Sequence, residues 1–302
     1  MPTIITRGAI SAQGFGFGSS SSSGPAPGTI GIFALGSLAT TRNKYTFATD
    51  TNGTATASGS ISQGGTSAGN STRGIVSIGR NGCFPSSLRE KYTYANDTSV
   101  SVAGSSAVAA FGSAAGNSTR GIFALGRSTS CFASTTRNKY TYACDTSGSA
   151  TASAATVDNS LAAAGNSTRG IFARGNSSAT LYRYTYALDT SVTGTALSSG
   201  LRYGAAAGNS TRGIFGLGSC SVTRNKYTYA CDTRSAATSS TRTCQSGGAT
   251  GNDTRGIFAL GGGCFARDKY TYSSDTNTTA TSGSATASFS SAVSNGITCV
   301  NI

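Results

Sequence analysis

Residues 113–126 read Ser-Ala-Ala-Gly-Asn-Ser-Thr-Arg-Gly-Ile-Phe-Ala-Leu-Gly, and residues 137–146 read Arg-Asn-Lys-Tyr-Thr-Tyr-Ala-Cys-Asp-Thr. Gly116-Asn117 is turn chemistry between a run of small residues and an apolar run, so this part predicts a β-hairpin. Tyr140 and Tyr142 alternate with polar residues, as in a strand with two different faces. Asp145 then opens a turn into a Ser/Thr/Ala strand, which makes four strands in all.

Both parts of this stretch recur six times in the 302-residue chain, always in the same order. The Gly-Ile-Phe/Val string recurs at spacings of 43, 47, 49, 43 and 43 residues, beginning at Gly31, Gly74, Gly121, Gly170, Gly213 and Gly256. The second string begins each time with a basic residue, namely Lys44, Lys91, Lys139, Arg183, Lys226 and Lys269. Self-similarity at a fixed period indicates a repeat architecture.

Four-stranded sheets at this period indicate either the blades of a β-propeller or a solenoid. Blades converge on a central axis, so the innermost strand needs small side chains and the outer part needs large ones. Here Ala, Ser and Gly form the first strand of each unit, and the tyrosine pairs lie on the third. We therefore predict an all-β fold, a six-bladed β-propeller with four-stranded blades.

The ends of the repeat array predict how the ring closes. Residues 31–35 start the first unit at its second strand, and no small-residue strand precedes them. Residues 290–296, Ser-Ser-Ala-Val-Ser-Asn-Gly, resemble that inner strand and its turn. We predict composite closure by this C-terminal strand, which removes an exposed sheet edge. The alternative is a seven-bladed ring. We assign residues 1–28 to an N-terminal arm with a Gly/Ser/Pro linker, and 29–302 to the propeller.

Catalysis needs a proton shuttle, a nucleophile or a metal, and the chain is poor in all of them. It has no His and one Glu, and six of its ten acidic residues are the repeated Asp of the Asp-Thr turn. We expect that Asp to be scaffold, which either accepts backbone N–H groups in an Asx turn or pairs between blades with the repeated Arg before Gly-Ile. We expect the Asn-x-Ser/Thr sites to be hairpin turns. The eight cysteines match no zinc spacing, and we expect reduced thiols packed in the core. We predict no enzymatic activity and no cofactor.

The charge of +13 invites a nucleic-acid interpretation, but sixteen of the 23 basic residues recur in the repeats and are spread around the molecule. We do not expect nucleic-acid binding; weak attraction to acidic surface polysaccharide fits the charge equally well. No segment approaches the length of a membrane span, and the N-terminus lacks the apolar core of a secretory signal. We expect no membrane insertion.

The order of a small strand, a turn, Arg-Gly-Ile-Phe-Ala-Leu-Gly, a loop, Asn-Lys-Tyr-Thr-Tyr and Asp-Thr resembles a degenerate kelch repeat. It departs from that family in the single glycine of most units and in the absence of Trp. More specifically, the repeats look like those of structural proteins of tailed phages, notably cyanophage-like ones, and residues 6–17 are similar to N-terminal segments of phage virion proteins. This resemblance implies a propeller in a virion, without catalytic residues.

Binding groups are expected where the repeat breaks, because repeated groups serve the scaffold. The fourth unit carries Arg174 in place of Leu and Tyr182 in place of Asn, and an insertion before the fifth unit adds Arg202 and Tyr203. Loop aromatics follow cysteines at Phe84, Phe132 and Phe265. Aromatic rings beside arginines suit stacking on sugars and equally suit protein interfaces. These seven residues are the candidate binding loops.

The leading hypothesis is a non-enzymatic, virion-associated binding protein, such as a tail-fibre or tail-tip propeller. The N-terminal arm would contact other virion proteins, and the loops would contact host surface glycan or protein. The alternatives are a purely structural decoration or assembly protein of the virion, and an extracellular bacterial adhesin. A homo-oligomer is left open.

Overall fold

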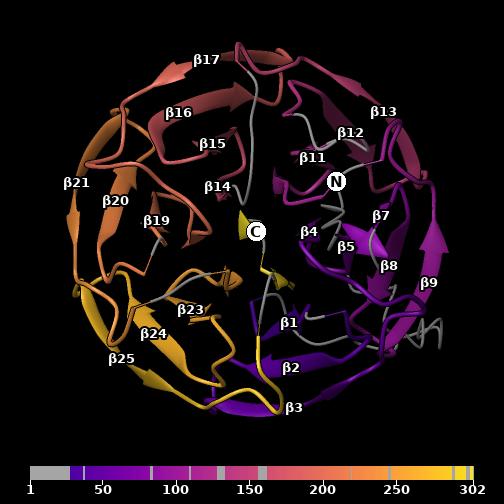
Figure 1. The fold of residues 1–302 in the computed structure, drawn as a ribbon, viewed down its shortest axis with the longest axis horizontal. Coiled ribbons are helices and arrows are strands. Elements are labelled where there is room, and N and C mark those ends of the chain that lie inside the picture. Colours follow the sequence, from indigo (N-terminus) through magenta and orange to yellow (C-terminus); the bar gives the residue numbers. More distant parts are fainter. Residues whose placement is uncertain are drawn as a thin grey trace, which may run out of the picture.

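The chain forms six four-stranded antiparallel blades around a central axis, a six-bladed β-propeller, in this computed structural model (Figure 1). The structure describes residues 28–36, 38–81, 84–108, 110–127, 133–155, 162–218, 220–243, 246–287, 290–296 and 300–301. The proposed arm, apart from Gly28, lies outside these residues. Within them, no helix is long and apolar enough to cross a membrane.

Each blade has an inner strand beside the axis, then a second and a third strand, and an outer strand at the rim. From inside to outside, the blades are β26 (Ser291–Ser294), β1 (Ile30–Ala34), β2 (Arg42–Thr46) and β3 (Thr51–Ala55) in blade 1; β4 (Thr66–Gly69), β5 (Arg73–Ser77), β8 (Arg89–Thr93) and β9 (Thr98–Val102) in blade 2; β10 (Ser113–Gly116), β11 (Arg120–Ala124), β12 (Arg137–Thr141) and β13 (Thr146–Ala150) in blade 3; β14 (Ala163–Gly165), β15 (Arg169–Gly175), β16 (Ser178–Thr185) and β17 (Thr190–Gly194) in blade 4; β18 (Ala205–Gly208), β19 (Arg212–Gly216), β20 (Arg224–Thr228) and β21 (Thr233–Ala237) in blade 5; and β22 (Ala249–Gly251), β23 (Arg255–Ala259), β24 (Arg267–Thr271) and β25 (Thr276–Ala280) in blade 6. A short hairpin of β6 (Arg80–Asn81) and β7 (Phe84–Pro85) decorates blade 2.

Composite closure is confirmed, and the seven-bladed alternative is wrong. Strand β26 pairs antiparallel with β1 in the register Gly31↔Ser294 to Ala34↔Ser291. The N–H of Gly28 also donates to the carbonyl of Asn295 at 3.0 Å, on the same side of the ring. The first and last parts of the chain therefore share blade 1, which has four strands like the other blades.

The chain continues from β26 into the central channel. Strand β27 (Val300–Asn301) pairs antiparallel with β10 of blade 3 and with β22 of blade 6, which lie on opposite sides of the axis. The C-terminal segment thus crosses the channel that the inner strands enclose, and the C label lies at the centre of the ring (Figure 1).

The inner strands can converge because their side chains are small. Ala114 and Ala115 of β10 are fully buried. At Gly121 an added Cβ would lie 2.8 Å from the Tyr142 hydroxyl and 2.9 Å from the Ala68 Cβ of blade 2. Only glycine lets two blades approach so closely here. Farther out, paired rings fill the widening wedge; the centroids of Tyr140 and Tyr142 lie 6.1 Å apart.

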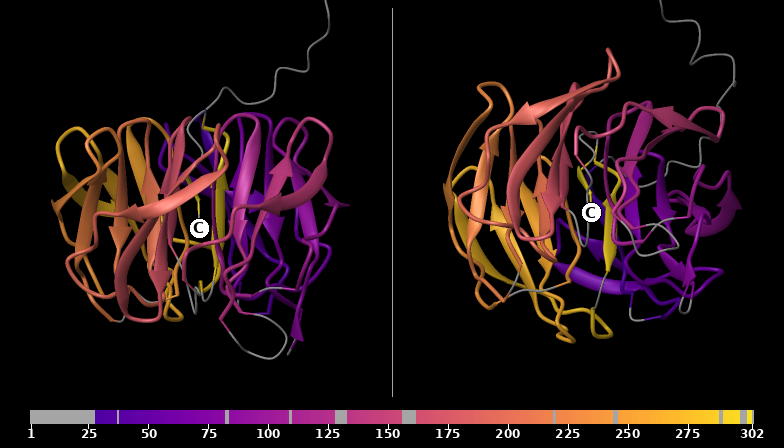
Figure 2. Two further views of the ribbon diagram at one scale, coloured as in Figure 1. Left: turned by 90° about the horizontal axis from the view of Figure 1, so that it is seen from above. Right: turned by 45° about the horizontal axis from the view of Figure 1, so that its top comes forward.

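The strands run between two faces of the flattened ring (Figure 2). We call one the turn face: it holds the hairpins between inner and second strands and the turns between third and outer strands. The other is the loop face: it holds the connections between second and third strands and those that join one blade to the next. Gly28 lies on the turn face, because its partners Asn295 and Asn252 belong to inner-strand hairpins.

Candidate functional site

The repeated aspartates join neighbouring blades on the turn face. All six have left-handed φ angles between 50° and 54°. Asp275 accepts a hydrogen bond from Tyr270 in its own blade. From blade 5 it receives Lys226 Nζ at 2.8 Å and the N–H of Thr238 at 3.0 Å. These carboxylates are inter-blade staples, as expected of scaffold groups, and not free acids.

The hydrogen bonds between blades also keep the aspartates ionised, because they lower the pKa of the carboxyl groups. Burial opposes ionisation of Asp50, but hydrogen bonds from Lys269 and Tyr45 outweigh it and hold the pKa of Asp50 at about 2. Asp189 is similar: burial opposes ionisation, and hydrogen bonds from Tyr184 and Thr151 bring its pKa to about 2. Such carboxylates stay charged at neutral pH and are poor general bases.

The Asn-x-Ser/Thr sites form the inner hairpin turns, as predicted. Asn117 Oδ1 accepts the N–H of Arg120 at 3.0 Å, and its Nδ2 donates to the carbonyl of Ser167 in blade 4 at 3.2 Å. Asn side chains make the equivalent contacts in the other hairpins, at Asn70, Asn166, Asn209 and Asn252. The Asn-x-Ser/Thr motif therefore serves to close the inner hairpins and to join neighbouring blades.

The arginines before Gly-Ile use mainly a different partner from the one predicted. Arg169 Nη1 donates to the carbonyl of Tyr229 in blade 5 at 2.7 Å. The same bond to the next blade's carbonyl is made by Arg73, Arg120, Arg212 and Arg255. Arg73 also reaches Asp145 at 3.2 Å, so the expected Arg–Asp pairing holds there. The repeated aspartates are otherwise occupied by the Lys or Arg of the third strand.

A second arginine set, at the start of the third strands, is buried in the seams between blades. Arg224 is 1% exposed, stacks 4.4 Å from the Phe258 ring centroid and pairs with Asp268 at 2.8 Å. Arg42 pairs with Glu90 at 2.7 Å in the same way. Sequence analysis missed this role. The signal was an acidic residue at a position that is usually Asn, one blade after each of these two arginines.

Tyr182 is not a binding residue, and its assignment to a loop is wrong. It lies in β16 and is only 4% exposed. Arg137 of blade 3 lies 6.0 Å from its ring centroid and 4.8 Å from that of Phe172. Tyr182 occupies the buried position that Asn138 holds in blade 3, so it fills the seam between blades 3 and 4.

The other predicted residues lie on the loop face but do not converge. Phe84 on blade 2 is 77% exposed and Phe265 on blade 6 is 51% exposed. Arg202 stacks 4.9 Å from the centroid of the half-buried Tyr203 ring, before blade 5. Arg174 is half-buried on blade 4. Phe132 lies outside the described residues.

Charge is distributed unevenly between the two faces. The Asp and Glu side chains that the structure describes lie on the turn face or inside the seams, and eight of them are ion-paired. The loop face carries one arginine on or just before each of blades 2 to 6, namely Arg80, Arg127, Arg174, Arg202 and Arg242. It is an aromatic and cationic face.

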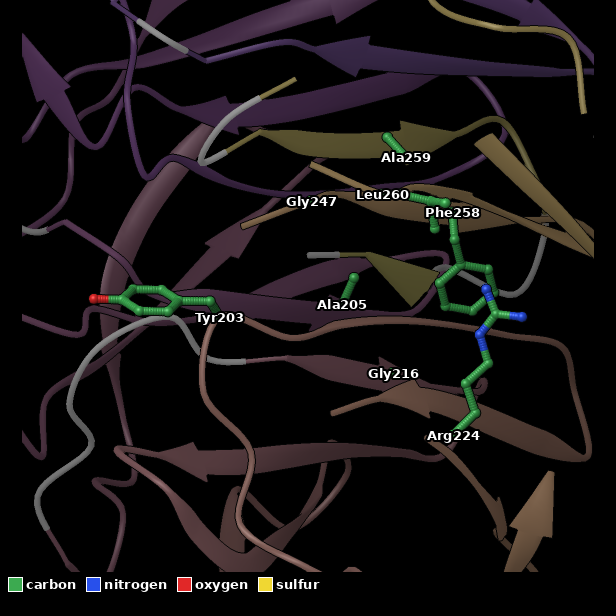
Figure 3. A pocket seen from close by; sticks show the side chains of 8 residues that line it. All are labelled: Tyr203, Ala205, Gly216, Arg224, Gly247, Phe258, Ala259 and Leu260. Carbon is green, nitrogen blue, oxygen red and sulfur yellow. The ribbon is translucent and has the colours of Figure 1, made fainter. Parts of the chain in front are cut away.

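Two hollows lie between blades 5 and 6. The smaller one, about 10 Å³, is the size of a water molecule; Figure 3 shows Arg224 against Phe258 at one end and Tyr203 apart from them. The larger one, which we call the blade 5–6 hollow, measures about 460 Å³ and opens on the loop face. It is lined by Thr241, Arg242, Gly263, Cys264, Phe265, Ala266, Arg267, Thr279 and Ser282.

Among the described side chains, no three His, Cys, Asp or Glu residues gather as metal ligands would. Cys144, Cys231 and Cys264 are free thiols on the surface, so they are not the packed core cysteines we expected.

The fold and the distribution of side chains thus define the class of protein: a six-bladed propeller with two chemically different faces. No family model matches the chain, and no curated protein matches it. Among solved structures, 367 chains match; one, titled "Structure of YjhT", has a TM-score of 0.60 at 9% identity and covers 92% of this chain and 98% of its own. At that identity the likeness shows the fold alone.

Proposed function

We propose that this chain is a non-enzymatic binding protein of a virion, which contacts host surface glycan or protein through its loop face. The difference between the two faces carries the proposal. On the turn face, charged side chains are repeated from blade to blade and bind neighbouring blades. On the loop face, arginines and exposed aromatics vary from blade to blade, apart from Arg80 and Arg127, which hold equivalent positions in blades 2 and 3.

Exposed aromatic rings support a contact role for this face. Phe84 and Phe265 are 77% and 51% exposed, although burial of a phenylalanine would be favourable by about 1.5–3 kcal/mol. Aromatic and arginine side chains are enriched in protein interfaces and dominate their energetics. These exposed rings, together with the arginines of the same face, support a partner that covers them.

The place where the chain enters the ring fits attachment from the opposite side. Gly28 is bound on the turn face, by Asn295 and by Asn252 Nδ2 at 2.9 Å. Attachment to other virion proteins through residues 1–27 would therefore leave the loop face directed away from the particle. The virion assignment itself rests on the sequence resemblance.

The proposal is tested by replacing three loop-face arginines together, in R80Q/R202Q/R242Q. We expect binding of the unmodified protein to host cells to weaken as salt is raised, and the triple variant to lose most of its binding and most of that salt dependence. The matched control is Arg234→Gln, an exposed arginine on the outer strand β21. Antibody labelling of particles tests the location.

If the triple variant binds host cells as well as the unmodified protein does, and antibody labels the virus particles, the results would favour the structural decoration protein instead. Labelling of bacterial surfaces but not of particles would favour the adhesin.

A further inference from the structure

We propose that the blade 5–6 hollow is a binding subsite for one acidic sugar unit, such as a uronic acid within an anionic polysaccharide. This rests on the proposed function, because it names the ligand class for one part of the loop face. The hollow measures about 460 Å³. That volume lies within the roughly 300–1,000 Å³ typical of small-ligand pockets, so it can admit a sugar ring.

Phe265 provides a fixed stacking surface in this hollow. Its side chain is 51% exposed, and its carbonyl accepts the N–H of Gly283 at 2.9 Å. The neighbouring Cys264 is held on both sides, by Gly261 at 3.0 Å and Ala287 at 3.2 Å. Because the backbone is fixed by these bonds, binding would cost little ordering of the loop.

Arg242 supplies the positive charge. It is exposed on the connection from blade 5 to blade 6, and none of the described carboxylates pairs with it. Asp268, the acid next to the hollow, is already bound by Arg224 at 2.8 Å and by the N–H of Thr241 at 3.0 Å. A ligand carboxylate would therefore meet the Arg242 guanidinium without competition from a neighbouring acid. Pairs of arginine and carboxylate are often bidentate.

The remaining wall favours a sugar over other anions. The hydroxyl groups of Thr279 and Ser282, which line the hollow, can donate or accept hydrogen bonds to sugar hydroxyls. The Thr241 hydroxyl donates to Asp268 and can still accept one. Arg267 also lines the hollow, but it is 1% exposed and bound to Asn52 Oδ1 at 2.7 Å. Nucleic acid would need a row of accessible cations and stacked rings. Here one ring and one accessible arginine face a single hollow.

The test measures binding of the full chain to polygalacturonate, with methyl-esterified polygalacturonate, dextran and single-stranded DNA as comparison ligands. We expect Phe265→Ala and Arg242→Gln each to weaken polygalacturonate binding by about tenfold, as for central contact residues. Esterification should cancel the effect of Arg242→Gln. The matched control is Leu188→Ala, which removes a 72% exposed apolar side chain on the turn face and should change binding by less than about twofold.

Equal losses in Leu188→Ala and Phe265→Ala would overturn the subsite, as would Arg242-dependent binding that is tighter for DNA than for polygalacturonate. Melting temperatures of all variants check that they are folded. If these hollow variants bind normally while R80Q/R202Q/R242Q still loses host-cell binding, the subsite fails and the proposed function stands. If that triple variant also binds host cells normally, the proposed function fails.

Discussion

The two aromatic residues on the third strand of a blade have different hydroxyl environments. In blade 5, Tyr227 donates its hydroxyl to Asp232. The hydroxyl of Tyr229 is buried without a hydrogen-bond partner among the described atoms, and burial raises the pKa of Tyr229 well above its usual value. Blade 1 has Phe47 at the position of Tyr229, so the fold accepts the loss of that hydroxyl.

We therefore expect Tyr227→Phe and Tyr229→Phe to differ sharply. Tyr227→Phe removes a hydrogen bond to a carboxylate and should lower the free energy of unfolding by about 1.5–3 kcal/mol. Tyr229→Phe removes only an unsatisfied hydroxyl and should leave that free energy unchanged or raise it slightly. Urea unfolding of both variants makes the comparison. Equal destabilisation would mean that the Tyr229 hydroxyl has a partner.

At this scale the sequence predicted the scaffold role of the repeated aspartates but misplaced Tyr182. The error has a physical cause. The equivalent Asn138 is polar, which suggested an exposed position, yet it is fully buried and bound to Ser106 at 2.7 Å. Periodicity cannot separate a buried, hydrogen-bonded asparagine from an exposed one, because the bond comes from a connection between blades.

The buried polar contacts between third strands of neighbouring blades lie near the beginning of those strands. The third strand of five blades begins with a buried arginine, and its partner lies one position further along on the third strand of the next blade. That partner is Glu90 or Asp268 at two seams and asparagine at two, such as Asn43, which accepts Arg267 Nη2 at 3.0 Å. At the remaining seam Arg137 faces Tyr182, whose ring centroid lies 6.0 Å away. A seam thus does not require a carboxylate.

This predicts different outcomes for Asp268→Ala and Asp268→Asn. Alanine leaves Arg224 buried without its partner and should lower the free energy of unfolding by about 3–5 kcal/mol. Asparagine keeps an acceptor, as in two other seams, and should retain more than half of that stability. Chemical unfolding would measure both. Loss of equal size in the two variants would show that the carboxylate charge itself is required.

The turns between third and outer strands predict how stability depends on pH. Hydrogen bonds hold the folded-state pKa of Asp50 and Asp189 at about 2, below the roughly 3.9 expected when unfolded. The unfolded chain therefore binds more protons, and the stabilisation is present above about pH 4 and lost as pH falls toward 2. We expect the melting temperature to drop across that window. Asp189→Asn should lower the melting temperature at pH 7 and make its fall between about pH 4 and pH 2 less steep.

A melting temperature that stays constant down to pH 2 would contradict the lowered pKa values of Asp50 and Asp189.

At the scale of the whole molecule, the ring was predictable because each unit repeats one supersecondary pattern and the first unit lacks its inner strand. The placement of β27 was not. Two residues carry no strand signal of their own, and their pairing with β10 and β22 depends on the width of a channel that exists only after the ring closes. The loop-face hollow could not be predicted either, because it brings together three separate segments of the chain, at residues 241–242, 263–267 and 279–282.

Two truncations separate the parts played by the C-terminal strands. Removal of residues 289–302 deletes β26, with its buried Ala292 and Val293, and should lower the free energy of unfolding by several kcal/mol. Removal of residues 297–302 deletes only β27 and should cost much less, because blade 1 keeps its inner strand. Thermal unfolding of both proteins checks this. Equal losses would shift the closing role from β26 to β27.

The central claim is that the loop face is the contact face. Hydroxyl-radical footprinting of the protein, free and bound to isolated host surface material, tests it most directly. Phe84 and Phe265 report on the loop face, and Leu188, which is 72% exposed, reports on the turn face. We predict protection of at least one phenylalanine and none of Leu188. Protection of Leu188 with both phenylalanines unchanged would contradict the claim.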